Sequence, residues 1–167
     1  MIENPGRIKK ALSKLKKLNV KKKFIHEKFT IDGEEFEEYI SEEIIRAVDF
    51  GFEAEDALVL LNPEYVLEFI NVKEHTRRKN LQDVRARVIG MKGKAKRTIE
   101  NLTGASIIIQ GNKVGVIVSS EHLNTTLNAI RSLIQGAKHS NIFAYLEKQN
   151  ANLRKFDSED LGLKIKE

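Results

Sequence analysis

A short glycine-containing loop is the part of this 167-residue sequence whose residue types are best suited to chemistry. Gly90 and Gly93 are separated by two residues, and Lys92 and Lys94 lie in the loop and directly after it. Glycine has no Cβ, so the backbone can pass close to a sugar–phosphate chain. A helix beginning after Gly93 would point free N–H groups at phosphate oxygens, and the lysines would add ionic attraction. The spacing predicts a phosphate-backbone site; the alternative is an ordinary turn before a helix.

The charge of the chain is strongly segregated, although the net charge is only +5. Residues 1–23 carry net +8, residues 24–70 net −12, residues 71–98 net +8 and the remainder net +1. The second basic block contains the glycine loop, and such blocks are typical of phosphate-binding surfaces. A solvated lysine face is the alternative reading. Residues 71–142 contain no aromatic side chain, which argues against base stacking on aromatic rings there.

Hydrophobic periodicity and turn residues predict the elements that must position this loop. Around the loop we expect, in order, a strand over 84–89, a helix over 94–102, strands over 105–110 and 113–118 joined by a tight Gly111-Asn112 hairpin, a long helix from Ser119 or Ser120 to Gly136, and a short helix over 142–148. Before it we expect a helix starting at Asn4-Pro5, an extended segment over 21–31, a helix from Phe36 that stops at Gly51, and short helices over 53–61 and from Asn62-Pro63 to about Ile70.

Several other chemistries have little support in the sequence. There is no cysteine, so thiolate metal sites and disulfides are excluded, and the four histidines show no metal-ligand spacing. No nucleophile–base pair and no Walker or dinucleotide motif is present, so we expect no catalytic residue, no metal and no cofactor. No apolar run is long enough to cross a membrane. These features predict a soluble, cytoplasmic, non-enzymatic protein without membrane contacts.

The loop and its surroundings resemble a type I KH domain. The resemblance rests on Val88-Ile89-Gly90-Met91-Lys92-Gly93, then Ile99, then Thr103-Gly104-Ala105, then Ile107, with a strand–strand–helix ending. It implies an α+β fold: a three-stranded antiparallel sheet with three helices. KH domains clamp about four nucleotides of a single strand with this loop. The family's apolar groove would add Ile89, Met91 and residues 107–109 as base contacts.

A narrower resemblance is to the Dim-two, or partner-of-Nob, family of KH-domain ribosome-assembly factors of archaea and eukaryotes. It rests on residues 93–103, including Lys96, on residues 133–143, and more weakly on Ala47 to Phe52 and residues 57–61. The N-terminal half lacks a Gly-x-x-Gly. We therefore expect a truncated, degenerate KH-like domain over 1–70, a basic helical linker over 71–82, the KH domain over 83–148 and a polar tail over 149–167.

The resemblance and the basic block together define a candidate RNA site: Arg85, Arg87, Ile89, Gly90, Met91, Lys92, Gly93, Lys94, Lys96, Arg97, Ile107, Ile108 and Ile109. By resemblance, the chain would bind the single-stranded 3′ region of small-subunit rRNA or its precursor. It would work with a Nob-type PIN endonuclease and with the alpha subunit of initiation factor two. The alternatives are a KH protein of the exosome or of mRNA regulation, and a protein–protein scaffold built from KH folds.

Overall fold

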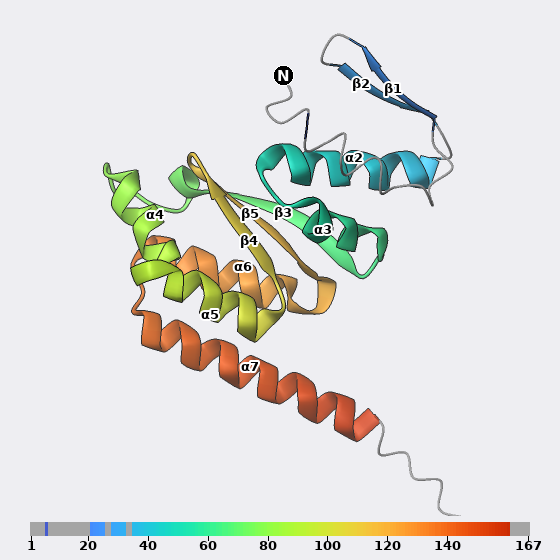
Figure 1. Cartoon of the computed structure of the whole chain (residues 1–167). Helices are drawn as coiled ribbons and strands as arrows, with labels where there is room; N and C mark the ends of the chain where they lie inside the picture. The colour runs from blue at the N-terminus through green and yellow to red at the C-terminus, as the bar shows by residue number, and fades with distance from the viewer. Residues whose placement is uncertain (1–5, 7–20, 26–27, 33–34, 161–167) are drawn as a thin grey trace, which may run out of the picture. The chain divides into compact units, whose positions relative to one another are not determined.

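The computed structural model describes residue 6, residues 21–25 and 28–32, and residues 35–160 (Figure 1). The predicted helix at Asn4-Pro5 lies outside these residues, as does the turn at Gly33. By its internal contacts the chain divides into two compact units, residues 1–70 with 106–120, and residues 71–105 with 121–167. None of the described helices is long and apolar enough to span a membrane.

Among the described residues of the first unit, a pair of strands comes first along the chain and a helix follows it. Strands β1 (Lys21–Ile25) and β2 (Lys28–Asp32) are extended, as predicted for this segment, but they form an antiparallel pair that the sequence did not predict. Helix α2 (Glu35–Phe50) ends at Gly51, whose φ of +121° suits glycine. The short helices α3 (Ala54–Ala57) and η1 (Leu58–Leu61) follow, as the sequence predicted.

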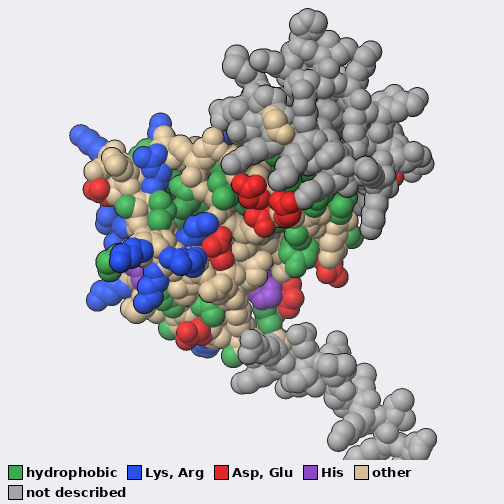
Figure 2. Space-filling view, viewed as in Figure 1, with side chains coloured by type: hydrophobic (Ala, Val, Ile, Leu, Met, Phe, Trp, Pro, Cys, Tyr) green, Lys and Arg blue, Asp and Glu red, His purple; other side chains and the backbone are tan. Residues whose placement is uncertain are grey.

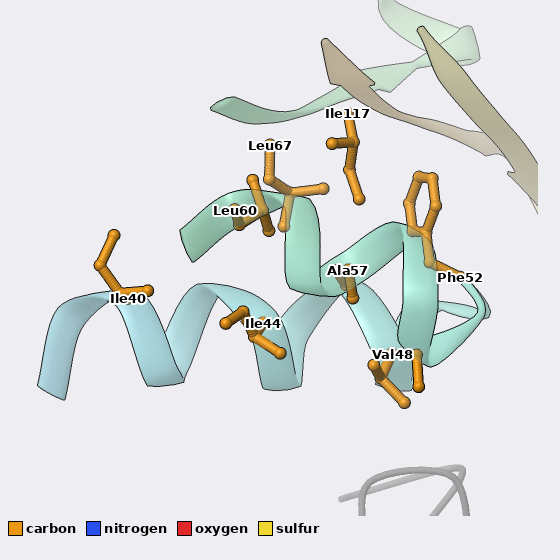
Figure 3. Packing of buried hydrophobic residues seen from close by; sticks show 10 residues of the cluster. Ile40, Ile44, Val48, Phe52, Ala57, Leu60, Leu67 and Ile117 are labelled. Atoms are coloured by element: carbon orange, nitrogen blue, oxygen red, sulfur yellow. The ribbon is translucent and has the colours of Figure 1, made fainter. Parts of the chain in front are cut away.

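A three-stranded antiparallel sheet completes the first unit, in the order β3 (Tyr65–Asn71), β5 (Lys113–Ser119), β4 (Ser106–Gln110). Gln110 pairs with Lys113, so Gly111 and Asn112 form the predicted two-residue turn. The core of the unit joins α2, α3 and η1 to the sheet (Figure 3), and its buried side chains include Ile44, Val48, Phe52, Leu60, Leu67 and Ile117.

The second unit is helical. It contains η2 (Val72–Glu74), α4 (Leu81–Ile89), η3 (Met91–Gly93), α5 (Lys94–Thr103), α6 (Ser120–Gln135) and α7 (His139–Asp160). The predicted helix over 94–102 is confirmed as α5, with Gly104 as its left-handed C-cap. The helix predicted from Ser120 to Gly136 is confirmed as α6. Along the chain, β3-α4-α5-β4-β5-α6 is the order expected of a type I KH domain.

Two predicted elements before the loop are wrong. Val84 to Ile89 is not a strand but part of helix α4, and the segment ending at Ile70 is not a helix but strand β3. Asn62 does not cap a helix: its side-chain oxygen accepts a hydrogen bond from the Glu64 N–H at 3.0 Å, which forms an Asx turn into β3. The strand that opens the KH order therefore lies upstream of residue 83.

The C-terminal helix is longer than the sequence predicted. Helix α7 runs for 22 residues, whereas we expected a short helix over 142–148 and a frayed tail from Gln149. Ile142 and Leu146 are buried, and the Asn150 side-chain amide donates to the Leu102 carbonyl at the end of α5. This contact with α5 holds the helix as far as Asn150, beyond the predicted end at residue 148.

Candidate nucleic-acid interface

The Gly90–Gly93 loop connects α4 to α5 in a backbone conformation that few residues adopt. Gly90 has φ +74° and ψ 171°, and Gly93 has φ +75° and ψ 12°. The Gly90 N–H donates to the Ala86 carbonyl at 2.8 Å and ends α4, while the Gly93 N–H donates to the Gly90 carbonyl at 3.1 Å. The loop is thus a tight, hydrogen-bonded turn and not an open connection.

Gly90 is also required by a close approach to α5. A Cβ atom placed on Gly90 would lie 2.5 Å from the Ala95 Cβ and 2.6 Å from the Ala95 backbone nitrogen. Real Cβ atoms essentially never come so close to backbone. The small side chain of Ala95 is therefore part of the site, although Ala95 is not among the site residues predicted from the sequence. In the sequence, the signal for this close approach is a glycine followed five positions later by the small residue Ala95.

Lys92 is the one non-glycine residue with positive φ in the described part of the chain, at φ +52° and ψ 30°. This left-handed conformation costs an L-residue about 1–2 kcal/mol, and glycine or asparagine would avoid much of that cost. Strain of this kind is found where function retains a side chain. Lys92 is exposed, so its ammonium group is presented to solvent.

The N-terminus of α5 is open to an anion. Gly93 is its N-cap and provides no side-chain acceptor, and no acidic residue lies in the first turn, although the Lys94 N–H already donates to the Met91 carbonyl of the loop. The helix end therefore keeps a partial positive charge, to which exposed Lys94 adds a full one. Met91 is 85% exposed and Ile89 38%, so two apolar side chains flank the cationic backbone.

The predicted basic residues have different roles in this structure. Arg97 donates to the Lys92 carbonyl and ties the loop to α5, and Lys96 forms an ion pair with Glu100 at 3.3 Å. The half-buried Arg87 donates from Nη2 to the Ala137 carbonyl at 2.7 Å. Arg87 thus holds the turn between α6 and α7. Arg85 is half-buried and has an interaction partner.

The three isoleucines of β4 belong to the other compact unit, so the structure does not bring them together with the loop in one unit. Ile107 is 1% exposed. Ile108 packs against the α2–α3 core, and its side chain lies 3.6 Å from the position of a Cβ on Gly51. Ile107 and Ile109 therefore point to the face of the sheet opposite Ile108. Of these two residues, Ile107 is buried and Ile109 is half-buried, so only Ile109 reaches the protein surface on that face.

Figure 2 shows Lys and Arg side chains gathered over α4 and the start of α5. Among the described residues, no group of three or more His, Asp or Glu side chains could hold a metal ion. The loop can attract an anion through the exposed Lys92 and Lys94 and through the positive end of the α5 dipole. It offers aliphatic, not aromatic, contacts beside them.

The comparison with protein families decides how this loop is to be classified. The model of the eukaryotic-type KH domain (KH-domain type I), named for the second KH domain of Pno1, matches residues 66–151. The chain belongs to the Pno1 family of type I KH-domain proteins. The matched residues begin in β3 and end in α7, so the Pno1-type domain includes every element around the loop.

Curated relatives match a large part of the chain. A KH domain-containing protein of Methanocaldococcus jannaschii is 35% identical over 114 residues, which are 68% of this chain and 50% of that protein. The pre-rRNA-processing protein pno1 of Aspergillus fumigatus is 28% identical over 83% of this chain and 57% of its own length. The chain thus spans about half the length of the curated relatives that it matches.

Solved structures extend the similarity of the fold to most of the chain. Dim2p from Pyrococcus horikoshii superimposes with a TM-score of 0.77 at 27% identity, covering 89% of this chain and 92% of that one. A complex of a/eIF2alpha, aDim2p and rRNA from the same organism matches with a TM-score of 0.76 at 28% identity, covering 90% and 86%. A protein of unknown function from Aeropyrum pernix, 22% identical, shares the fold with a TM-score of 0.83 over 96% and 88% of the two chains.

Proposed function

We propose that this chain binds single-stranded RNA through the Gly90–Gly93 loop and assists small-ribosomal-subunit biogenesis. Its ligand would be the 3′ region of the small-subunit rRNA or its precursor. The observation that carries the proposal is the strained, exposed Lys92 between two glycines at the N-terminus of α5, whose first turn holds no acidic residue. A phosphate placed there would meet the positive end of the α5 dipole and two ammonium groups.

The proposed contact residues are narrower than the set predicted from the sequence. Gly90, Met91, Lys92, Gly93 and Lys94 form the clamp, with Ile89 beside it. Arg87 and Arg97 act by holding the backbone, because their guanidinium groups donate to main-chain carbonyls. Ile108 is left out since it packs against the α2–α3 core.

The relatives support the ribosomal context. One of them is named for pre-rRNA processing, and a solved relative is held in a complex with a/eIF2alpha and rRNA. We propose the alpha subunit of initiation factor two as a partner on that basis. A Nob-type PIN endonuclease is a further proposed partner, which would cut the strand that this chain positions. The chain itself would act in the cytoplasm and cut nothing.

The test is fluorescence anisotropy with a labelled single strand copying the mature 3′ end of small-subunit rRNA. The double variant Met91→Asp/Lys92→Asp should bind at least about tenfold more weakly at 0.1 M salt, because it replaces attraction by repulsion at the phosphate. Asp tolerates the left-handed conformation of Lys92, so the loop should keep its shape.

A matched control separates the loop from overall charge. Tyr39→Asp/Lys113→Asp also replaces one exposed apolar and one exposed basic residue and changes the net charge by the same amount. It should bind RNA nearly as well as the wild type. Equal affinities for the two double variants would refute the loop as the site, provided that both unfold at temperatures close to the wild type.

A further inference from the structure

A second group of basic side chains lies at the other end of α4 from the glycine loop. Arg77, Arg78 and Lys79 precede the Asn80 cap of α4 and are all exposed. Helix α4 has nine residues and is about 13 Å long, so the two groups are separated by more than one Debye length at physiological salt. These three residues fall within the linker predicted over 71–82.

These cations are not neutralised within the structure that is described. No ion pair joins Arg77, Arg78 or Lys79 to a carboxylate of the described residues. The two nearby acids are held by asparagines: Glu74 accepts from the Asn71 amide and Asp83 from the Asn80 amide, each at 2.8 Å. Three adjacent exposed cations without carboxylate partners favour a polyanion.

The turn between α6 and α7 links this group to the loop. Arg78 lies against Gly136, since a Cβ there would be 3.0 Å from its Nη2. One residue later the Ala137 carbonyl accepts from Arg87, and the His139 ring nitrogen is 2.8 Å from the Arg87 carbonyl. Residues 136–139 therefore run along α4 from Arg78 toward the loop, and exposed Lys138 lies on that path.

We infer that Arg77, Arg78, Lys79 and Lys138 form a second phosphate-contact surface, the α4 track. It would hold the backbone of the same single strand outside the nucleotides clamped at Gly90–Gly93, so it rests on the proposed function. No large hydrophobic side chain is exposed in the described part of this unit except Ile89 and Met91 at the loop. The α4 track therefore adds affinity without reading bases.

The experiment uses a six-nucleotide strand and twelve-nucleotide strands that extend it on the 5′ or on the 3′ side. The variant is Arg77→Ser/Lys79→Ser, which spares Arg78 because of its contact with Gly136. The control is Lys113→Ser/Lys148→Ser, which removes two exposed lysines elsewhere. Affinities are measured by anisotropy from 0.05 to 0.5 M salt.

The wild type should bind one of the two longer strands more tightly than the short one, and the variant should lose that gain. The loss of two phosphate contacts to a single strand should make the slope of log affinity against log salt concentration shallower by about 1.4. At 0.1 M salt this change corresponds to an affinity up to about 25-fold lower. The variant should bind the short strand like the control. A gain in affinity that persists in the variant would overturn the α4 track.

A wild type that does not bind even the short strand would instead overturn the proposed function. Tighter binding of a hairpin duplex than of either single strand would show that the surface serves double-stranded RNA and would also overturn the inference as stated.

Discussion

The substitution Gly90→Ala tests the structural reading of the loop most sharply. The added Cβ would lie 2.5 Å from the Ala95 Cβ and 2.6 Å from the Ala95 nitrogen, and the latter belongs to the backbone of α5. The φ of +74° with ψ 171° falls in a region that is essentially restricted to glycine. Two separate penalties therefore act on the same methyl group.

Each penalty has a known scale. Placing a non-glycine residue in this backbone region costs about 1–3 kcal/mol. Forcing a methyl into a packed contact costs about 1–3 kcal/mol more. We therefore expect the free energy of unfolding to fall by about 4 kcal/mol, because neither the α4 cap nor the Ala95 backbone can move away cheaply.

Gly104→Ala is the matched control for this prediction. Gly104 also has positive φ, at +66°, and caps the C-terminus of α5, but a Cβ there meets no atom within 4 Å. Its loss should be only the left-handed penalty of about 1–2 kcal/mol. Urea unfolding followed by circular dichroism measures both variants. If Gly90→Ala were no more destabilising than Gly104→Ala, the close approach of Gly90 to Ala95 would be refuted.

Three further predictions concern single contacts. Lys92→Gly should raise the free energy of unfolding by about 1 kcal/mol, because glycine adopts positive φ without strain. It should also weaken RNA binding about fivefold at 0.1 M salt, because one phosphate contact is lost. Urea unfolding and fluorescence anisotropy of the same variant check both effects, and a loss of stability would contradict the prediction. Gly115→Ala should cost about 1–3 kcal/mol in urea unfolding, because its Cβ would lie 2.6 Å from the Phe50 ring and 2.9 Å from that of Phe52; an unchanged midpoint would show that the two rings move aside. Arg87→Met should cost about 1.5–3 kcal/mol by removing the charged hydrogen bond to Ala137, and should speed amide hydrogen exchange in the α6–α7 turn; unaltered exchange there would contradict the clamp.

The sequence predicted the elements between the loop and Gly136 well because each had a local signal. Gly104 and Gly136 end helices, and Gly111-Asn112 closes a two-residue hairpin. Such signals depend on backbone conformation at one or two residues, and tertiary packing has little power to override them.

The elements before the loop were misjudged because their patterns fit two structures. Val84 and Val88 are both buried and four residues apart, which suits a helix, but Val84, Ala86 and Val88 also alternate like a strand. The Asn80–Asp83 cap was the missed helix signal. Conversely, Asn62-Pro63 looks like a helix start, but the β-branched and aromatic run from Tyr65 to Ile70 forms a strand.

The glycine loop of the candidate site could be predicted from the sequence, but the side chains that hold the loop in place could not. The spacing of Gly90 and Gly93 predicted a turn directly before a helix, which the structure confirms, whereas phosphate binding at this turn stays a prediction. The roles of Arg87 and Arg97 were not predictable, because their acceptors are main-chain carbonyls: that of Arg87 lies 50 residues away, and that of Arg97 depends on the shape of the loop. A basic residue near a glycine loop can bind RNA or hold the loop, and only the folded chain distinguishes the two.

Crosslinking in living cells followed by sequencing of the bound RNA tests the central claim most directly. The account predicts that crosslinks of the wild-type chain concentrate in the 3′ region of small-subunit rRNA, and that Met91→Asp/Lys92→Asp removes them while Tyr39→Asp/Lys113→Asp does not. A predominance of messenger RNA, or crosslinks that the loop substitutions leave unchanged, would contradict it.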